Sequence, residues 1–248
     1  MTRQITRAIT VMTIVLSLWF PTRAQETLSG EVAVTAQKAG QQKGYLIANF
    51  TVNDSVTFQK YRNAAAGLAQ KYQGKMIMRD VNSKTVEGDA PREITAIIEF
   101  PSFDHAEGYY NSPEYTAARV FGIAAAERLV ILAKGIFPEN EPKDSGQAKG
   151  YLVANFTIQD QDTFKKYIES GGSLVGKFNG NTLIYDVDAK TVEGNGEHII
   201  AVMEFASFAD LDRFYNSPEY TAARKFRIAA TKGSVVLGEG IRENPKAK

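Results

Sequence analysis

The chain has 248 residues, of which 44% are hydrophobic and 23% are charged, a composition typical of folded globular proteins. Its formal net charge is only +1, which argues against the large basic surface of a nucleic-acid-binding protein. The absence of cysteine from the sequence excludes disulfides, thiolate metal sites and a lipoprotein anchor.

The first 24 residues have the organisation of a secretory signal peptide. Arg3 and Arg7 precede an uncharged stretch, 8–20, and the sequence Thr-Arg-Ala at 22–24 places small residues at a cleavage site. The uncharged stretch is too short to span a bilayer comfortably, although an uncleaved anchor is the alternative. We expect residues 1–24 to be removed, which leaves 26 basic and 28 acidic residues in a periplasmic or secreted protein without a membrane segment.

The remaining sequence contains two near copies of one unit. The segment at 43–51 returns at 149–157 with one change, and the segment at 111–119 returns unchanged at 216–224. We therefore expect two repeats of one small fold, at 43–135 and 149–240. The other expected parts are a polar N-terminal segment, a linker and a C-terminal tail, at 25–42, 136–148 and 241–248.

The first repeat alternates strand and helix patterns. The predicted elements are a strand, a helix, two strands, a two-part helical region and a strand, at 44–52, 55–72, 76–81, 93–100, 102–127 and 129–134. The segment 84–88 is expected to continue the second strand irregularly and to end in a glycine with positive φ. Asn111-Ser112-Pro113 interrupts the second helical region, where a serine cap followed by proline predicts a restart. The second repeat follows the same order.

The order βαββαβ is that of a ferredoxin-like α+β fold, with an antiparallel four-stranded sheet and two helices on one face. In strand 44–52, one row of side chains is apolar enough to lie under the helices. The other row, with Tyr45, Ile47, Asn49 and Thr51, is still half apolar, and exposure of such a sheet face would be a liability. We therefore expect the two sheets to pack face to face as an intrachain pseudo-dimeric αβ barrel, with a cavity between the repeats.

Several of these motifs resemble domain-of-unknown-function family 1330. The resemblance lies in the strand 44–47, Val86-Glu87-Gly88, Ile98-Glu99-Phe100, and the run 110–115 followed by Arg119, and the second repeat has the same motifs. It implies the fold of dimeric αβ-barrel proteins, which pair ferredoxin-like units through their sheets. Family members are typically single-domain, so a tandem exported chain is a departure. The wider class includes cofactor-free oxygenases, isomerases, haem-degrading enzymes and binding proteins, so the fold does not select an activity.

Glu99 and Glu204 are the candidate catalytic carboxylates. Each lies in a largely apolar strand, where a carboxylate needs either water or a partner. Inside the barrel each would be a general base with a raised pKa. The alternatives are a structural ion pair with Arg119 or Arg224, or an exposed strand end.

The Asn-Ser-Pro-Glu-Tyr segments supply further candidates. Their tyrosines would line the mouth of the cavity, and an arginine one helical turn farther along would bind a substrate carboxylate. Together with two strand asparagines, the candidate ligand-binding residues are Asn49, Asn155, Tyr110, Tyr215, Tyr115, Tyr220, Arg119 and Arg224. Helix capping and packing alone are the alternative explanation for these segments.

The sequence gives no signal for a metal or a cofactor. His105 and His198 are the only histidines, and neither lies in a metal-ligand spacing, so we expect both on the surface. Three hypotheses for function stay open: binding of a small organic ligand between the repeats, a cofactor-independent oxygenase or isomerase with Glu99 or Glu204 as base, and a structural or partner-binding module with a solid core.

Overall fold

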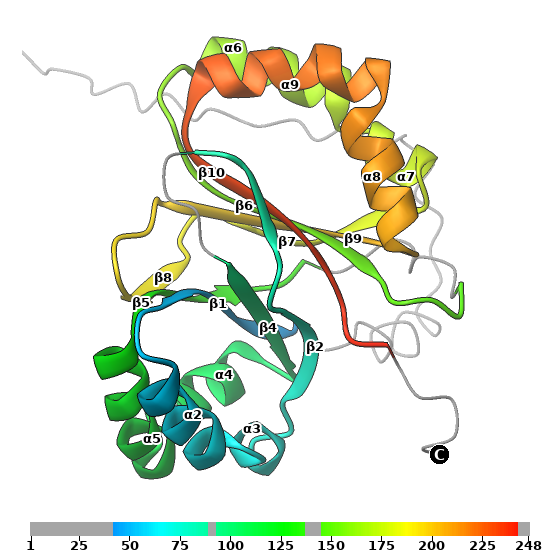
Figure 1. Cartoon of the computed structure of the whole chain (residues 1–248). Coiled ribbons are helices and arrows are strands. Elements are labelled where there is room, and N and C mark those ends of the chain that lie inside the picture. The colour runs from blue at the N-terminus through cyan, green and yellow to red at the C-terminus, as the bar shows by residue number, and fades with distance from the viewer. Residues whose placement is uncertain (1–41, 89–92, 137–144, 243–248) are drawn as a thin grey trace, which may run out of the picture. The chain divides into compact units, whose positions relative to one another are not determined.

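The structure is a computed structural model that describes residues 42–88, 93–136 and 145–242 (Figure 1). The predicted signal peptide at 1–24 lies outside the described residues, as do most of the polar segment and parts of the linker and the tail. Within the described ranges, every helix is too short or too polar to traverse a lipid bilayer.

The two repeats contain the same elements in the same order. The first comprises β1 (Gly44–Val52), α2 (Ser55–Ala65), α3 (Leu68–Lys71), β2 (Lys75–Asp80), β3 (Lys84–Glu87), β4 (Ile94–Phe100), α4 (Phe103–Tyr110), α5 (Pro113–Ala125) and β5 (Ala126–Lys134). The second comprises β6 (Gly150–Ile158), α6 (Gln161–Gly171), α7 (Leu174–Lys177), β7 (Gly180–Asp186), β8 (Lys190–Glu193), β9 (Ile199–Phe205), α8 (Phe208–Asn216), α9 (Pro218–Ala230) and β10 (Thr231–Glu239). This order confirms the predicted duplication.

The bounds of the first helix follow its local chemistry. Asp54 caps α2 by accepting hydrogen bonds from the backbone N–H groups of Val56 and Thr57. The helix ends at Ala65, earlier than predicted, because Gly67 adopts a φ of 73° and separates α2 from α3.

The duplicated Asn-Ser-Pro-Glu-Tyr segment restarts a helix in each repeat. Ser112 accepts a hydrogen bond from the backbone N–H of Tyr115, and Ser217 accepts one from that of Tyr220. Proline occupies the first turn of α5 and of α9, where its missing N–H is not needed. These contacts confirm the predicted capping role of the segment.

Each sheet has five strands rather than the predicted four. One has the order β2-β4-β1-β5-β8 and the other the order β3-β10-β6-β9-β7. The fifth strand in each sheet comes from the other repeat, because β8 pairs with β5 and β3 pairs with β10. Figure 1 shows the exchange most clearly for the yellow strand β8, which lies beside β5.

This exchange corrects the prediction that segment 84–88 continues the preceding strand. After β2, Asp80 accepts a hydrogen bond from the backbone N–H of Asn82, and this contact helps to turn the chain. Strand β3 then pairs with β10 and covers backbone groups at its edge. Gly88 follows β3 with a φ of 94°, and Gly194 follows β8 with a φ of 74°, which confirms the predicted need for glycine.

The two sheets pack face to face, as predicted. The buried cluster between them contains residues of both repeats, including Tyr45, Ile47, Ile97, Tyr151, Val153 and Val202. Each of these six side chains is at most 3% exposed, so this interface is a packed core. The alternate row of β1, with Leu46, Ala48 and Phe50, packs under the helices. In Figure 1, α2 to α5 cover one sheet and α6 to α9 cover the other.

Candidate functional site

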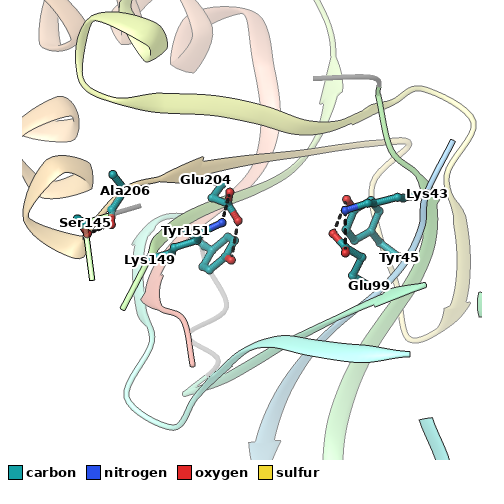
Figure 2. A network of polar contacts seen from close by, with 8 residues as sticks. All are labelled: Lys43, Tyr45, Glu99, Ser145, Lys149, Tyr151, Glu204 and Ala206. Atoms are coloured by element: carbon teal, nitrogen blue, oxygen red, sulfur yellow. Dashed lines mark hydrogen bonds and ion pairs between the residues drawn. The ribbon is translucent and has the colours of Figure 1, made fainter. Parts of the chain in front are cut away.

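Glu99 lies in an ion pair with a lysine. Nζ of Lys43 is 2.8 Å from Oε1 of Glu99, and the hydroxyl of Tyr45 donates to Oε2 at 3.1 Å (Figure 2). The predicted ion pair of Glu99 with Arg119 is wrong, because Arg119 lies on α5, on the helix side of the sheet. Glu99 shares a row with Tyr45, its directly opposite residue in β1, and this row faces the other sheet.

Glu204 repeats the arrangement in the second half of the chain. Lys149 Nζ is 2.8 Å from Oε1, and the hydroxyl of Tyr151 donates to Oε2 at 2.7 Å (Figure 2). Arg224 was the expected partner and lies instead on α9, again on the helix side. Both oxygens of this carboxylate are therefore engaged by donors of its own repeat.

The two tyrosines in these clusters stay protonated. Burial, followed by the charge of the adjacent glutamate, raises the pKa of Tyr45 and of Tyr151 far above the ordinary range. Glu204 also raises the pKa of Tyr45, and Glu99 that of Tyr151, so each phenol is influenced by both carboxylates. We infer that the two clusters are structural hydrogen-bond networks at the interface between the repeats.

The two candidate asparagines are buried and bind their own chain. Asn49 Nδ2 donates to the hydroxyl of Thr95 at 2.8 Å. Asn155 Nδ2 donates to the carbonyl oxygens of Glu197 and Ile199 at 3.0 and 2.9 Å, and its Oδ1 accepts from the backbone N–H of Glu197 at 2.9 Å. These contacts hold neighbouring backbone segments in place.

The candidate arginines cover tyrosine rings. The guanidinium of Arg119 lies 4.4 Å from the ring centroid of Tyr110, and that of Arg224 lies 4.3 Å from the ring of Tyr215. Arg224 Nη1 also donates to the backbone carbonyl of Tyr215 at 3.3 Å. Both arginines are half-buried, and these contacts account for their position after the Asn-Ser-Pro-Glu-Tyr segment.

The hydroxyl groups of these tyrosines contact glutamates of the exchanged strands. Tyr110 donates to Oε1 of Glu193 at 3.1 Å, and Tyr215 donates to Oε1 of Glu87 at 2.9 Å. Burial, followed by the charge of Glu193, raises the pKa of Tyr110 to about 12. Burial, followed by the charge of Glu87, raises the pKa of Tyr215. Tyr110 and Tyr215 therefore each link their own repeat to the other.

Each of these glutamates is also paired with a buried arginine. Nε of Arg128 lies 2.6 Å from Oε2 of Glu193, and the two side chains are 3% and 9% exposed. Nη2 of Arg227 donates to both oxygens of Glu87 at 2.7 and 2.9 Å, with side chains 6% and 16% exposed. Each ion pair joins residues of both repeats, because the glutamate lies on the exchanged strand.

Tyrosines surround the buried guanidinium groups. The hydroxyl groups of Tyr61 and Tyr115 are 3.1 Å apart, and Nη2 of Arg128 donates to Tyr115 at 3.4 Å. Tyr115 and its copy Tyr220 are each 1% exposed. We had expected these tyrosines at the mouth of a cavity. They lie instead in the cores of their repeats, because each helix turns this ring toward the sheet.

A cavity of about 290 Å³ lies beside the Arg227–Glu87 ion pair. Its lining comes from β3, β6, α9 and β10 and includes Glu87, Gly88, Phe156, Arg227, Gly233 and Ser234. Residues of both repeats thus line it, but none of them belongs to the packed cluster between the two sheets. The cavity therefore lies at the edge where β3 joins the second sheet and not between the two sheet faces.

A family model described as "Domain of unknown function (DUF1330)" matches the chain twice, at residues 43–136 and 149–241. The chain belongs to the DUF1330 family. The two matches confirm the resemblance inferred from the sequence motifs and show a tandem repeat of the DUF1330 domain. No curated protein matches the chain.

Solved structures resemble the tandem DUF1330 fold. A mutant chlorite dismutase from Candidatus Nitrospira defluvii, in complex with cyanide, has 8% identity and a TM-score of 0.51, covering 80% of this chain and 90% of its own. An anthrone oxidase-like protein has 14% identity and a TM-score of 0.48, covering 81% and 91%. A proposed monooxygenase from Lactobacillus acidophilus has 12% identity and a TM-score of 0.45, covering 82% and 95%. At such low identity, the similarity to the chlorite dismutase shows the dimeric α+β barrel fold alone.

Sequence reasoning missed Arg128 and Arg227 because they are not equivalent in the two DUF1330 repeats. The comparison of the copies selected only residues that recur at the same place. Glu87 and Glu193 do recur, within the duplicated Lys-Thr-Val-Glu-Gly segment, but a strand edge and a glycine turn were a sufficient explanation for that segment. The recurrence of this glutamate next to the β-branched pair Thr-Val, which favours a strand, was the available signal for a paired carboxylate.

The histidines show no metal site. His198 is exposed, whereas His105 is half-buried, with its Nδ1 2.8 Å from the hydroxyl of Ser102. Across the described ranges, no group of three histidine, aspartate or glutamate side chains is placed to hold a metal ion.

Replacing Glu204 with glutamine is expected to lower the free energy of unfolding by about 1.5–3 kcal/mol, because a charged hydrogen-bond acceptor is lost. Glu99→Gln is expected to cost less, because the Glu99 side chain is 20% exposed and that of Glu204 only 8%. Urea denaturation at neutral pH measures both losses. If both variants are as stable as the wild type, the carboxylates are not structural and become candidate bases again.

Proposed function

We propose that the protein is an exported binder of a small organic molecule, which it holds in the cavity beside Arg227 and Glu87. The observation that carries this proposal is the placing of a buried guanidinium, with unused donors, on the wall of a cavity. Export rests on the signal-peptide pattern at 1–24. Amino-terminal sequencing of the exported protein is expected to begin at Gln25, and a chain that keeps Met1 would contradict this expectation.

Arg227 has N–H groups without a hydrogen-bond partner in the described ranges, and these favour a ligand that carries an oxygen acceptor. Nη2 donates both hydrogen bonds to Glu87. Nε and Nη1 donate none to the residues that the structure describes. An arginine carries five N–H donors and does not lose its proton in proteins. A carbonyl, phenol or carboxylate oxygen that enters the cavity would therefore find donors at any physiological pH.

The other walls of the cavity favour a small and mostly apolar body. Phe156 and Ile228 contribute apolar surface, and Thr231 and Ser234 contribute hydroxyl groups. An aromatic side chain such as Phe156 favours a planar ring in offset or edge contact. The volume of about 290 Å³ is at the lower end of the range of roughly 300–1,000 Å³ for ligand pockets. We therefore propose a single-ring molecule with one oxygen-containing group.

The position of the carboxylates supports binding over the proposed catalysis. Glu99 and Glu204 are engaged by lysine and tyrosine and do not line the cavity. Glu87 does line it, but it already accepts hydrogen bonds from Arg227 and Tyr215. The oxygens of these carboxylates are therefore already engaged by donors of the chain itself.

Ser234→Leu tests the site by filling the cavity. Leucine is compatible with the fold at this place because the equivalent residue of the first repeat is Leu129. With acetophenone as the probe, we expect saturable binding to the wild type and at least a tenfold weaker affinity in the variant, which corresponds to about 1.4 kcal/mol. Ser170→Leu, on the exposed side of α6, is the matched control and should bind as the wild type does.

Toluene separates the role of the oxygen from that of the ring. It lacks the acceptor for Arg227, so we expect it to bind more weakly than acetophenone by the worth of one hydrogen bond to a charged group, about 1.5–3 kcal/mol. Ligand-observed NMR titration measures both affinities. Unchanged acetophenone binding by Ser234→Leu, or no binding by the wild type, would refute the proposed site for this ligand class.

A further inference from the structure

An arginine and a glycine have exchanged places between the two repeats. Alignment of α5 with α9 places Gly122 opposite Arg227. Alignment of the strands that follow places Arg128 of β5 opposite Gly233 of β10. The first repeat therefore supplies its buried arginine from a strand, and the second supplies it from a helix.

The two guanidinium groups nevertheless reach equivalent places. Arg128 pairs with Glu193 and Arg227 pairs with Glu87, which are the same residue of the duplicated Lys-Thr-Val-Glu-Gly segment. Both bonds cross between the repeats through an exchanged strand. The positive charge thus lies at the same place in both repeats. The side chain that carries it starts from strand β5 in the first repeat and from helix α9 in the second.

The element from which the arginine starts decides whether its side chain fills the space between the helix and the sheet. In the first repeat, the guanidinium of Arg128 lies 5.0 Å from the ring centroid of Phe50. In the second repeat, the equivalent ring is Phe156, which lines the cavity together with Gly233. The arginine side chain that starts at β5 is missing at β10, and a cavity is found there.

Arg128 also fills the space below the helix of its own repeat. A methyl group added at Gly122 would collide with Nη1 of Arg128, so the glycine is needed for the arginine to fit. This Nη1 is buried and makes no hydrogen bond with the residues that the structure describes. A buried donor without an acceptor is unusual. It indicates that packing, more than hydrogen bonding, determines the position of Nη1.

We propose that the arginine–glycine exchange decides which repeat binds a ligand: Arg128 occupies the pocket of the first repeat, and Gly233 leaves that of the second repeat open. This inference rests on the proposed function, and it adds that the chain binds one ligand and not two. In the first repeat, a part of the chain itself takes the place of the ligand.

The double variant Gly122→Arg/Arg128→Gly tests the proposal by giving the first repeat the arrangement of the second. Calorimetric titration with acetophenone is expected to give one site per chain for the wild type and two for the folded double variant. One site in both proteins would overturn the inference and leave the proposed function intact. No site in the wild type would instead refute the proposed function.

Rescue of Arg128→Ala provides a second test that does not depend on acetophenone. If the side chain fills a pocket, its removal leaves a place for ethylguanidinium, which should raise the melting temperature of this variant by binding the folded state. Arg119→Ala, which removes a half-buried arginine stacked on Tyr110, is the matched control and should gain nothing. Folding of Arg128→Ala only with ethylguanidinium would also support the proposal. Equal effects of ethylguanidinium on the two variants would overturn it.

Discussion

Replacing Arg128 with methionine is expected to lower the free energy of unfolding by about 3–5 kcal/mol, because it leaves a buried carboxylate without its counter-ion. The Glu193 side chain is 9% exposed, so water reaches the orphaned charge poorly. The hydroxyl of Tyr110 remains as a donor to it at 3.1 Å, but a phenol does not supply a positive charge. Urea denaturation of the variant and the wild type measures the loss.

Two control variants identify the cause of this loss. Arg128→Met/Glu193→Leu removes both charges and should regain most of the stability, because apolar replacement of a complete buried pair is often neutral. Lys190→Met removes an exposed ion pair of the same strand, in which Nζ is 2.6 Å from Glu107, and should cost at most about 1 kcal/mol. If Arg128→Met costs no more than Lys190→Met, the buried pair is not a major source of stability.

The duplicated sequence predicted the fold because strand alternation depends on local pattern. Tyr45 and Ile47 lie in one row and Leu46 and Ala48 in the other, and the structure places these rows in the two separate cores that the alternation requires. The recurrence of both rows in the second repeat made face-to-face packing the simplest way to bury the half-apolar faces. The capping signal at Ser112 was equally local, and its hydrogen bond is present.

The exchange of strands could not be predicted in the same way. The β-branched residues Thr85 and Val86 favour a strand in Lys84–Glu87, but they do not say which sheet edge the strand will join. Because the repeats are copies, β5 and β10 offer similar edges, and the choice between them depends on the turn that follows β2. The site depended on this choice, since the exchange is what brings Glu87 to Arg227.

Recurrence in both repeats identified some residues of the candidate site but did not give their partners. Tyr110 and Tyr215 were selected because they recur, and they do contact the buried ion pairs. The recurring glutamates Glu99 and Glu204 were assigned to catalysis because an unpaired carboxylate in an apolar strand is costly. Their lysine partners come from the residues just before β1 and β6, and only the register of the sheet shows that these lysines reach them.

Gly194→Ala is expected to destabilise the protein by about 2–4 kcal/mol, because a positive φ costs a residue with a Cβ roughly 1–2 kcal/mol before any collision. The φ of Gly194 is 74°, and an added methyl group would collide with the backbone carbonyl oxygen of Arg128. The collision lies where β8 ends on β5, so relief requires the exchanged strand to move away from its partner.

Gly176→Ala is the matched control in the same repeat. Apart from its chain neighbours and the backbone of its own helix, no described atom lies within 4 Å of a methyl group added at this position in α7, so we expect a neutral effect or a gain of up to about 1 kcal/mol. Hydrogen exchange adds a local measurement, since displacement of β8 should speed exchange of its amides more than that of the amides in the central strand β1. Equal protection of β8 in Gly194→Ala and in the wild type would show that the methyl group is accommodated without loosening the exchanged strand.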